Sequence, residues 1–499
     1  MKKLLAILLI ALLTASAFTS CGKKKALEEP TEEITEQITE EITNDGAGDS
    51  TTADDNGNGG NGGNGGNGGN ADNGGNADNG GNGDNGGNGD NGGSGDNGGS
   101  GDNGGSGDNG GNGGSGDNDN TGDNGNTGDN NNTGDNNNTG DNNNTGNDDN
   151  NQNDDESPKQ VESIEDLKEI EPDGNYILTG DIDLNGAEWT PVGDAENPFT
   201  GTFNGNGYTI SNLTINSTAQ HVGLFGYNAG TIENLKLTNV TVNATNSETN
   251  IYVGALIGKN EGTVKKCYAE GTVNGTVNAP DEASSAVIGG LIGFSSTGDV
   301  AECGASCTVT ATSESKISCA GGLIGFVNSG NVTNSYACGD VFAYYNALTQ
   351  TEENSSAAGG LIAHNSKGVI SNCYASGNAT AISQYVGPAF SAGLVASHMN
   401  NGTITNCYAL GNVTAQTVSN YISNGGALCG YITAGYTSTV QNSYCSSSQT
   451  ISASSNYSYV EEKSLTEIQS VDFHTSTLGW STDVWSFTYG ELPTLKALA

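Results

Sequence analysis

The hydrophobic pattern of this chain is dominated by a short apolar phrase that recurs seven times between Val222 and Gly430. Its copies are VGLFG, VGALIG, IGGLIG, AGGLIG, AGGLIA, SAGLVA and GGALCG. Their leucines are spaced by 32, 35, 32, 38, 33 and 34 residues, at Leu224, Leu256, Leu291, Leu323, Leu361, Leu394 and Leu428. Self-similarity at a period of this length predicts a solenoid, a propeller or an array.

Two further apolar phrases follow in each copy. After the first phrase comes a turn, then a segment such as GTVKKCYA or GNVTNSYA, and then a third piece such as GTVNGTV. Each repeat therefore predicts three short strands, separated by Gly, Asn or Ser turns. A propeller blade needs four strands in about 40–45 residues, and copies of uneven length fit a coil better than a closed ring. We predict an all-β fold, a right-handed parallel β-helix over residues 213–450.

Alignment of the second phrases produces three columns of equivalent residues. The central column is expected to point into the coil, and it contains Leu213, Leu235, Cys267, Cys303, Ser335, Cys373, Cys407 and Ser443. The preceding column is mostly asparagine, which tolerates a left-handed bend and can stack its amides along the rod. The following column turns outward by strand alternation, and its tyrosines are Tyr268, Tyr336, Tyr374, Tyr408 and Tyr444.

This tyrosine column has two interpretations. Rings on neighbouring strands can simply stabilise each other across the sheet. Alternatively, an outward row of aromatic side chains can form a platform that binds a glycan or a polypeptide.

The flanks of the repeats predict caps, because the open end of a solenoid must be protected from edge pairing. Residues 158–212 are expected to form an N-terminal cap and the first strands, with Ser163 and Asp166 in position to cap a short helix and with an aromatic cluster around Trp189. Residues 451–499 are expected to form a C-terminal cap, with Ser464 starting a short helix before Trp480, Trp485 and Phe487.

Residues 1–21 predict a secretory signal peptide, with two lysines, an apolar run from Leu4 to Leu13 and then small residues. The apolar run is too short for a stable membrane-spanning helix. The ending Phe-Thr-Ser-Cys resembles a bacterial lipobox, which implies that Cys21 is lipidated and anchors the protein in the membrane. The alternative is an ordinary signal peptide with an incidental cysteine.

Residues 22–157 predict a disordered acidic linker. They are built largely from Gly, Asn, Asp, Ser and Thr, in hexamers such as GDNGGS and GDNNNT. A calcium-binding β-roll would need a hydrophobic residue in every repeat, and these hexamers contain none. Such a composition cannot bury a core, so the segment is expected to be a tether.

The charge balance argues against nucleic acid as a partner. The chain has 58 Asp and Glu residues against 15 Lys and Arg, and all fifteen basic residues are lysine. Affinity for nucleic acid comes largely from Lys and Arg contacts to phosphates.

The segment GGLIGFVNSGNVTNSYACGDV (Gly321–Val341) resembles the GLUG repeat. That repeat occurs in bacterial surface proteins, including haemagglutinin-type adhesins and the non-catalytic region of streptococcal IgA-specific zinc metallopeptidases. The resemblance implies a cell-surface protein. The metallopeptidases need an HExxH helix, whereas His221, His364, His398 and His474 are followed by Val, Asn, Met and Thr, so that catalytic domain is not expected.

No catalytic, cofactor or metal site is predicted. Pectinolytic lyases of β-helical shape commonly use calcium and a basic residue, often arginine, and this chain has no arginine. A hydrolase needs two carboxylates about 5–10 Å apart, and nothing distinguishes Asp181 and Asp183 as such a pair. The cysteines of the repeats are expected to be buried thiols. The alternative is a disulfide from Cys303 to Cys307 or Cys319.

The predicted function is that of a secreted, lipid-anchored protein of the bacterial cell surface, which displays a β-helical rod on an acidic tether. We expect it to bind a glycan or a host or envelope protein through the side of the rod or its longer loops, near Ala279–Ser285 and Ala343–Ser356. Two alternatives remain open at this stage: a polysaccharide-active lyase or hydrolase, and a passive envelope spacer.

Overall fold

The computed structural model describes residues 157–279, 284–348, 354–418, 421–433, 438–457 and 460–499. All described residues belong to one compact unit, which contains residues 152–499. The predicted signal peptide, Cys21 and the linker up to residue 156 lie outside the described residues. Within the described ranges, no helix is long and apolar enough to cross a membrane.

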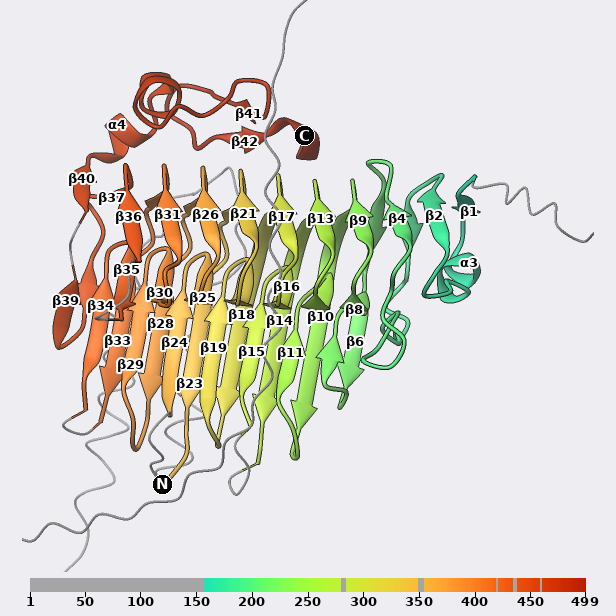
Figure 1. The fold of residues 1–499 in the computed structure, drawn as a ribbon, viewed down its shortest axis with the longest axis horizontal. Helices are drawn as coiled ribbons and strands as arrows, with labels where there is room; N and C mark the ends of the chain where they lie inside the picture. The colour runs from blue at the N-terminus through green and yellow to red at the C-terminus, as the bar shows by residue number, and fades with distance from the viewer. Residues whose placement is uncertain (1–156, 280–283, 349–353, 419–420, 434–437, 458–459) are drawn as a thin grey trace, which may run out of the picture. The chain divides into compact units, whose positions relative to one another are not determined.

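The described residues form a right-handed parallel β-helix, which confirms the predicted fold class (Figure 1). Each full coil passes through four parallel sheets, here called A, B, D and C in the order in which the chain meets them. The prediction of three strands per repeat is wrong. The GLIG phrase does not form one strand but bends at its Gly-Leu pair, so that it ends a strand of sheet D and starts a strand of sheet C.

Sheet A contains short strands whose middle residue points into the coil, as the burial of Val264 and Ile370 shows. Its ten strands are β1 (Lys159–Val161), β2 (Asn175–Leu178), β4 (Thr202–Asn204), β9 (Thr231–Glu233), β13 (Thr263–Lys265), β17 (Asp299–Ala301), β21 (Asn331–Thr333), β26 (Val369–Ser371), β31 (Thr403–Thr405) and β36 (Thr439–Gln441).

Sheet B contains the longest strands, and later coils divide them into two pieces. Its fifteen strands are β3 (Ile182–Asp183), β5 (Thr209–Ser211), β6 (Thr214–Ser217), β10 (Lys236–Asn246), β14 (Tyr268–Val277), β18 (Gly304–Ser313), β22 (Tyr336–Ala337), β23 (Val341–Tyr345), β27 (Tyr374–Ala375), β28 (Ala379–Ser383), β32 (Tyr408–Ala409), β33 (Val413–Thr417), β37 (Tyr444–Ser446), β38 (Ile451–Ser452) and β40 (Glu461–Lys463).

Sheets D and C meet at the bend of the GLIG phrase. Sheet D contains β7 (His221–Val222), β11 (Ile251–Val253), β15 (Ala286–Gly289), β19 (Ile317–Gly321), β24 (Ser355–Gly359), β29 (Ala389–Ala392), β34 (Ser423–Gly426) and β39 (Ser455–Tyr457). Sheet C contains β8 (Phe225–Asn228), β12 (Ile257–Asn260), β16 (Ile292–Ser295), β20 (Ile324–Val327), β25 (Ile362–Asn365), β30 (Val395–His398) and β35 (Cys429–Ile432).

The two ends of the described region differ. At the N-terminal end, helix α3 (Ile164–Lys168) follows β1, and Ser163 and Asp166 form the expected capping box. At the C-terminal end, Ser464 caps α4 (Leu465–Ile468) as predicted. The remaining elements are a π-helix (Phe473–Thr477), the antiparallel pair β41 (Trp485–Ser486) and β42 (Thr494–Leu495), and a 3-10 helix (Lys496–Leu498).

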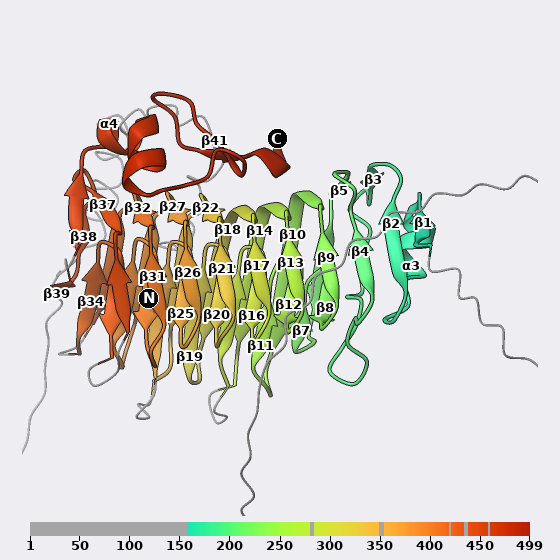
Figure 2. The same ribbon diagram turned by 45° about the horizontal axis from the view of Figure 1, so that its top comes forward.

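The C-terminal segment does not close the end of the rod, which corrects the expectation of a C-terminal cap. After β40 the chain turns back and runs along the outside of sheet B, over β37, β32, β27 and β22 (Figure 2). Its last residue reaches the middle of the rod, where Lys236 Nζ donates a hydrogen bond to the backbone oxygen of Ala499 at 3.2 Å. The aromatic residues of this segment therefore cover a side face.

The bend from sheet A to sheet B is made by the predicted asparagine column. Its members all have a left-handed backbone, with φ between 43° and 55° at Asn234, Lys266, Glu302, Asn334, Asn372, Asn406 and Asn442. The amides also stack, since Asn442 Nδ2 donates to Asn406 Oδ1 at 2.7 Å and Asn406 Nδ2 donates to Asn372 Oδ1 at 3.2 Å. Both predicted roles of this column are confirmed.

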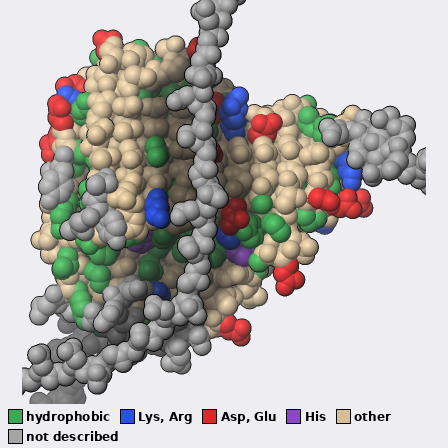
Figure 3. Space-filling model, in the orientation of Figure 1, with side chains coloured by type: hydrophobic (Ala, Val, Ile, Leu, Met, Phe, Trp, Pro, Cys, Tyr) green, Lys and Arg blue, Asp and Glu red, His purple; other side chains and the backbone are tan. Residues whose placement is uncertain are grey.

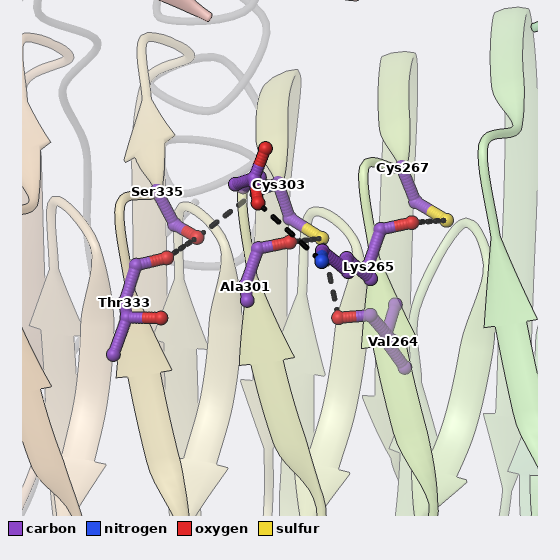
Figure 4. Close-up of polar contacts among 8 residues, drawn as sticks. Val264, Lys265, Cys267, Ala301, Cys303, Thr333 and Ser335 are labelled. Atoms are coloured by element: carbon purple, nitrogen blue, oxygen red, sulfur yellow. Dashed lines mark hydrogen bonds and ion pairs between the residues drawn. The ribbon is translucent and has the colours of Figure 1, made fainter. Parts of the chain in front are cut away.

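The next column points inward, and after its two leucines it contains either cysteine or serine (Figure 4). The thiol of Cys303 donates to the carbonyl of Ala301 at 3.2 Å, and the hydroxyl of Ser335 donates to the carbonyl of Thr333 at 2.8 Å. Both side chains thus pair with the carbonyl two residues earlier, which explains why either residue type fits. Cys303, Cys307 and Cys319 are free, so the alternative of a disulfide among them is not realised.

The bend between sheets D and C requires glycine because neighbouring coils touch there. A Cβ at Gly360 would lie 2.1 Å from the carbonyl oxygen of Gly393 in the next coil, and one at Gly322 would lie 2.0 Å from that of Gly360. The leucine column beside these glycines is 0–1% exposed, so it forms the inner wall of the coils as predicted.

We expect Gly360→Ala to lower the stability of the rod by about 1–3 kcal/mol, because the new methyl group must push two coils apart. Gly180→Ala is the matched control, since nothing lies within 4 Å of its Cβ position. Urea denaturation, monitored by circular dichroism, measures the unfolding midpoint of each variant. Equal midpoints for the two variants would contradict the proposed contact between coils.

Burial should also make the thiols unreactive in the folded protein. It raises the pKa of Cys307 to about 12 and raises the pKa of Cys319 as well, whereas alkylation requires the thiolate. We expect iodoacetamide to leave both residues unmodified until the protein is denatured, without any need for a reductant, as mapped by peptide mass spectrometry. Modification that appears only after reduction would instead indicate a disulfide.

Candidate functional site

The side chains of the predicted tyrosine column point outward from sheet B, as strand alternation predicted. Its rings are stacked, with centroids 5.3 Å apart for Tyr336 and Tyr374 and 5.2 Å apart for Tyr374 and Tyr408. Four of the five tyrosines are nevertheless buried: Tyr336, Tyr374, Tyr408 and Tyr444 are 7%, 1%, 0% and 9% exposed. Tyr268 is half-buried and bonds to Glu270 at 3.1 Å.

The returning C-terminal segment buries these rings. Trp480 stacks on Tyr408 with centroids 5.6 Å apart and on Trp485 at 4.7 Å. The Tyr374 hydroxyl donates to the carbonyl of Pro493 at 2.9 Å, and Trp480 Nε1 donates to the carbonyl of Asn406 at 3.0 Å. The structure therefore does not present this column as an exposed platform, and a ligand would first have to displace the segment.

His474 is the titratable residue at the centre of this contact. Its ring is 2% exposed and packs against Trp480 and Phe487. Nδ1 lies 3.0 Å from the carbonyl of Ser470, and Nε2 lies 3.2 Å from the hydroxyl of Tyr408. Burial lowers the pKa of His474 from 6.5 to about 4, so the ring is neutral at pH 7.

A second outward surface lies where sheets D and C meet, and we call it the C–D face. It consists of two facing rows in which each residue pairs in register with its neighbour in the next coil. The row on sheet C contains Tyr227, Lys259, Phe294, Phe326, His364, Ser397 and Tyr431. The row on sheet D contains His221, Tyr252, Val287, Cys319, Ala357, Phe390 and Asn424.

The floor of the C–D face is made of small residues. A Cβ at Gly258 would meet the backbone of Val222 at 2.5 Å, and one at Gly293 would meet that of Val253 at 2.4 Å. In later coils the same position holds Ala363 and Ala396, both 0% exposed. The two sheets thus approach closely on the outside of the rod, and the larger side chains of both rows stand above this floor.

Aromatic rings follow one another along the C–D face. Tyr252 and Phe294 have centroids 5.1 Å apart, Phe294 and Phe326 are 5.4 Å apart, and Phe326 and His364 are 5.6 Å apart. Unlike the buried tyrosines, Tyr252, Phe294 and Phe326 remain partly exposed. Figure 3 shows separate hydrophobic and histidine side chains on the lower part of the front of the rod.

One end of the C–D face carries a cation. Lys259 Nζ lies 4.2 Å from the ring centroid of Tyr227, donates a hydrogen bond to its hydroxyl oxygen at 2.8 Å, and pairs with Glu261 at 3.0 Å. Burial, and then the charge of Lys259, lower the pKa of His221 to about 4. The salt bridge balances the charge at this end.

The middle of the C–D face contains a pocket of about 150 Å³. Sheet C contributes Phe294, Phe326 and His364. Sheet D and the residues before it contribute Asn250, Tyr252, Ser285, Val287, Ile317 and Cys319. The lining contains no Asp, Glu, Lys or Arg side chain.

The enzymatic alternative considered Asp181 and Asp183 as a pair of carboxylates, and the structure describes the surroundings of Asp183. Asp183 accepts hydrogen bonds from Asn212 Nδ2 at 2.6 Å and from the backbone of Asn185 at 2.8 Å. The bond from Asn212 lowers the pKa of Asp183, whereas a general acid needs a raised value. In the part of the chain that the structure describes, no three His, Cys, Asp or Glu side chains gather in a metal-binding cluster.

The loops predicted to lengthen the binding surface are only partly described, since residues 280–283 and 349–353 lie outside the described ranges. The C–D face itself was missed. Its signal is the residue directly after the GLIG phrase, which is aromatic or histidine at Tyr227, Phe294, Phe326, His364 and Tyr431. Strict alternation would not have revealed this column, because Phe294 lies two residues after the buried Ile292 and a period of two places both side chains on the same face.

Lowering the pH should loosen the C-terminal segment. A protonated His474 is disfavoured in the packed state, where its pKa is about 4, but not in the released state, where it is near 6.5. The contribution of this residue to stability is therefore complete above pH 6.5 and is lost as the pH falls toward 4. Tryptophan emission of Trp480 and Trp485 should shift to longer wavelength over this range.

His474→Gln is the control for this titration, because it removes the ionisable group and keeps a polar side chain of similar reach. The emission shift between pH 6.5 and 4 should be smaller in this variant than in the natural protein. An identical shift in both proteins would show that another group controls the segment.

Comparison with known proteins identifies the repeat. Residues 249–274 and 354–380 match the family described as the GLUG motif. Halomucin from Haloquadratum walsbyi is 36% identical over 24% of this chain and 1% of its own length. A protein of Evansella cellulosilytica, named as a Gly-rich membrane protein, is 38% identical over 19% of this chain and 11% of its own length. The chain thus spans only a small part of these relatives.

Two solved structures align with the described fold. A protein from Bacteroides ovatus, titled as an immunoglobulin A1 protease, has a TM-score of 0.42 and 17% identity over 69% of this chain and 93% of its own. A second, titled IgA1 Protease, has a TM-score of 0.38 and 20% identity over 60% of this chain and 23% of its own. At these scores the alignments carry no argument about activity. The stacked coils of this chain thus carry the GLUG motif at two places, residues 249–274 and 354–380.

Proposed function

We propose that this chain is a surface-displayed binding protein and that its ligand lies along the C–D face. The observation that carries the proposal is the contrast between the two aromatic columns of the rod. The tyrosine column is covered by the C-terminal segment, whereas Tyr252, Phe294 and Phe326 remain partly exposed around an apolar pocket. Partly exposed aromatic side chains around a pocket are typical of binding sites.

The proposed location is the outer surface of the cell, with the rod held away from the membrane. The signal peptide, the lipobox-like sequence at Cys21 and the acidic linker support this arrangement. The name of the Evansella relative, a membrane protein, is compatible with it.

We favour a polypeptide ligand over a glycan. Neighbouring rings of the C–D face lie 5.1–5.6 Å apart and are tilted to one another by 35–48°, so they contact each other and do not form one flat row of free ring faces. A sugar stacks on a free ring face and brings many hydroxyl groups that need partners, whereas the pocket lining is mainly apolar. Apolar side chains of an extended polypeptide suit such a surface better.

The test is binding of the full chain to a peptide array and a glycan array. The variant Phe294→Ser/Phe326→Ser should lose at least about tenfold in binding to its peptide ligands, since aromatic residues dominate interface energies. Tyr489→Ser is the matched control, because Tyr489 is 74% exposed and lies outside the C–D face. Circular dichroism and thermal midpoints confirm that both variants fold.

Three results would contradict parts of this proposal. Glycan binding that depends on Phe294 and Phe326 would support the C–D face as the binding site but would show that the ligand is a glycan and not a polypeptide. An equal loss of binding in Tyr489→Ser would show that the ligand does not bind specifically at the C–D face. Binding to neither array would favour a passive spacer.

A further inference from the structure

His364 has an environment that the fold alone does not require. It stands in the sheet C row of the C–D face, in register with Phe326 of the preceding coil. The side chain is 7% exposed, yet neither Nδ1 nor Nε2 has a hydrogen-bond partner. The equivalent positions one and two coils earlier hold phenylalanine, so an apolar ring would satisfy the packing.

A buried imidazole without partners is an unfavourable arrangement, because a neutral ring offers one donor and one acceptor that need pairing. His364 lines the pocket of the C–D face, so a ligand in that pocket can supply the missing partner. Burial lowers the pKa of His364 to about 4, and the ring is therefore neutral at pH 7. It can donate one hydrogen bond and accept another without carrying charge.

The size and lining of the pocket restrict the ligand. A cavity of about 150 Å³ lined by apolar side chains takes up a benzene-sized group, and this pocket has that volume. Phe294, Phe326 and Val287 surround the space with apolar surface. No charged side chain lines it, so a carboxylate or an ammonium group would lose its hydration without compensation.

We infer that the pocket beside His364 binds one uncharged, hydroxylated aromatic ring, that is, a phenol. The ring lies among Phe294, Phe326 and Val287, and its hydroxyl group exchanges a hydrogen bond with the imidazole of His364. A tyrosine side chain of a polypeptide and a free phenolic compound share this chemistry. The inference rests on the proposed binding function of the C–D face and specifies the group that is recognised there.

Ligand-detected saturation-transfer NMR on the full chain tests the inference with two probes of equal size. p-Cresol carries the hydroxyl group, and toluene lacks it. We expect p-cresol to bind roughly three- to tenfold more tightly than toluene, the effect of one net hydrogen bond. His364→Phe should abolish this preference and retain toluene binding, because phenylalanine already occupies the equivalent place in neighbouring coils.

A second variant keeps the test independent of His364. Val287→Phe should fill the pocket and reduce binding of both probes, because Val287 lines it. Failure of p-cresol to bind the natural protein, or the same preference for p-cresol in His364→Phe, would overturn the inference.

The source of the ring is decided by a third probe, N-acetyltyrosinamide. Binding at least as tight as that of p-cresol assigns the pocket to a tyrosine side chain of a polypeptide. Binding of p-cresol alone assigns it to a free phenolic compound. These measurements do not depend on the arrays, so the pocket can bind a phenol even if the array experiment shows no macromolecular ligand, and the two failures are distinguishable.

Discussion

The structure depends on the in-register stacking of its coils. Strands of neighbouring coils lie about 4.8 Å apart, and each residue lies beside its equivalent in the next coil. A residue type can therefore occupy a position only if it packs against the residues at the same position in the neighbouring coils. Leucine does so in the core, asparagine through its amide ladder, and cysteine and serine through bonds to their own backbone. Where backbones of adjacent coils touch, only glycine fits.

The same constraint explains which features the sequence could predict. Strand alternation is local, so the inward column of Cys373 and the outward column of Tyr374 could be assigned from neighbouring residues. The left-handed bends at Asn372 and its equivalents follow from the known tolerance of asparagine. The fourth strand was not predicted because glycine is the only turn residue at the bend inside the GLIG phrase. Glycine can also occur within a buried strand, so it did not mark the bend.

The candidate site was harder to predict because its exposure is decided by distant parts of the chain. Whether the tyrosines face solvent depends on residues 66 and 119 positions away, as the contacts of His474 with Tyr408 and of Pro493 with Tyr374 show. No local sequence pattern indicates that the C-terminal segment covers the tyrosine column. The C–D face, in contrast, is formed by residues adjacent to the most regular phrase of the repeat, and its rings at Tyr252, Phe294 and Phe326 are partly exposed.

The returning C-terminal segment has a consequence for how such a rod can change in length. It starts at the last coil and ends at Lys236 of β10, and it contacts the tyrosine of several intervening coils. A solenoid of this kind can gain or lose a coil with little effect on its neighbours, but the segment has a fixed span. An added coil would leave part of the column unprotected, and a lost coil would leave part of the segment without a surface. The fixed length of the C-terminal segment therefore fits a rod with one particular number of coils.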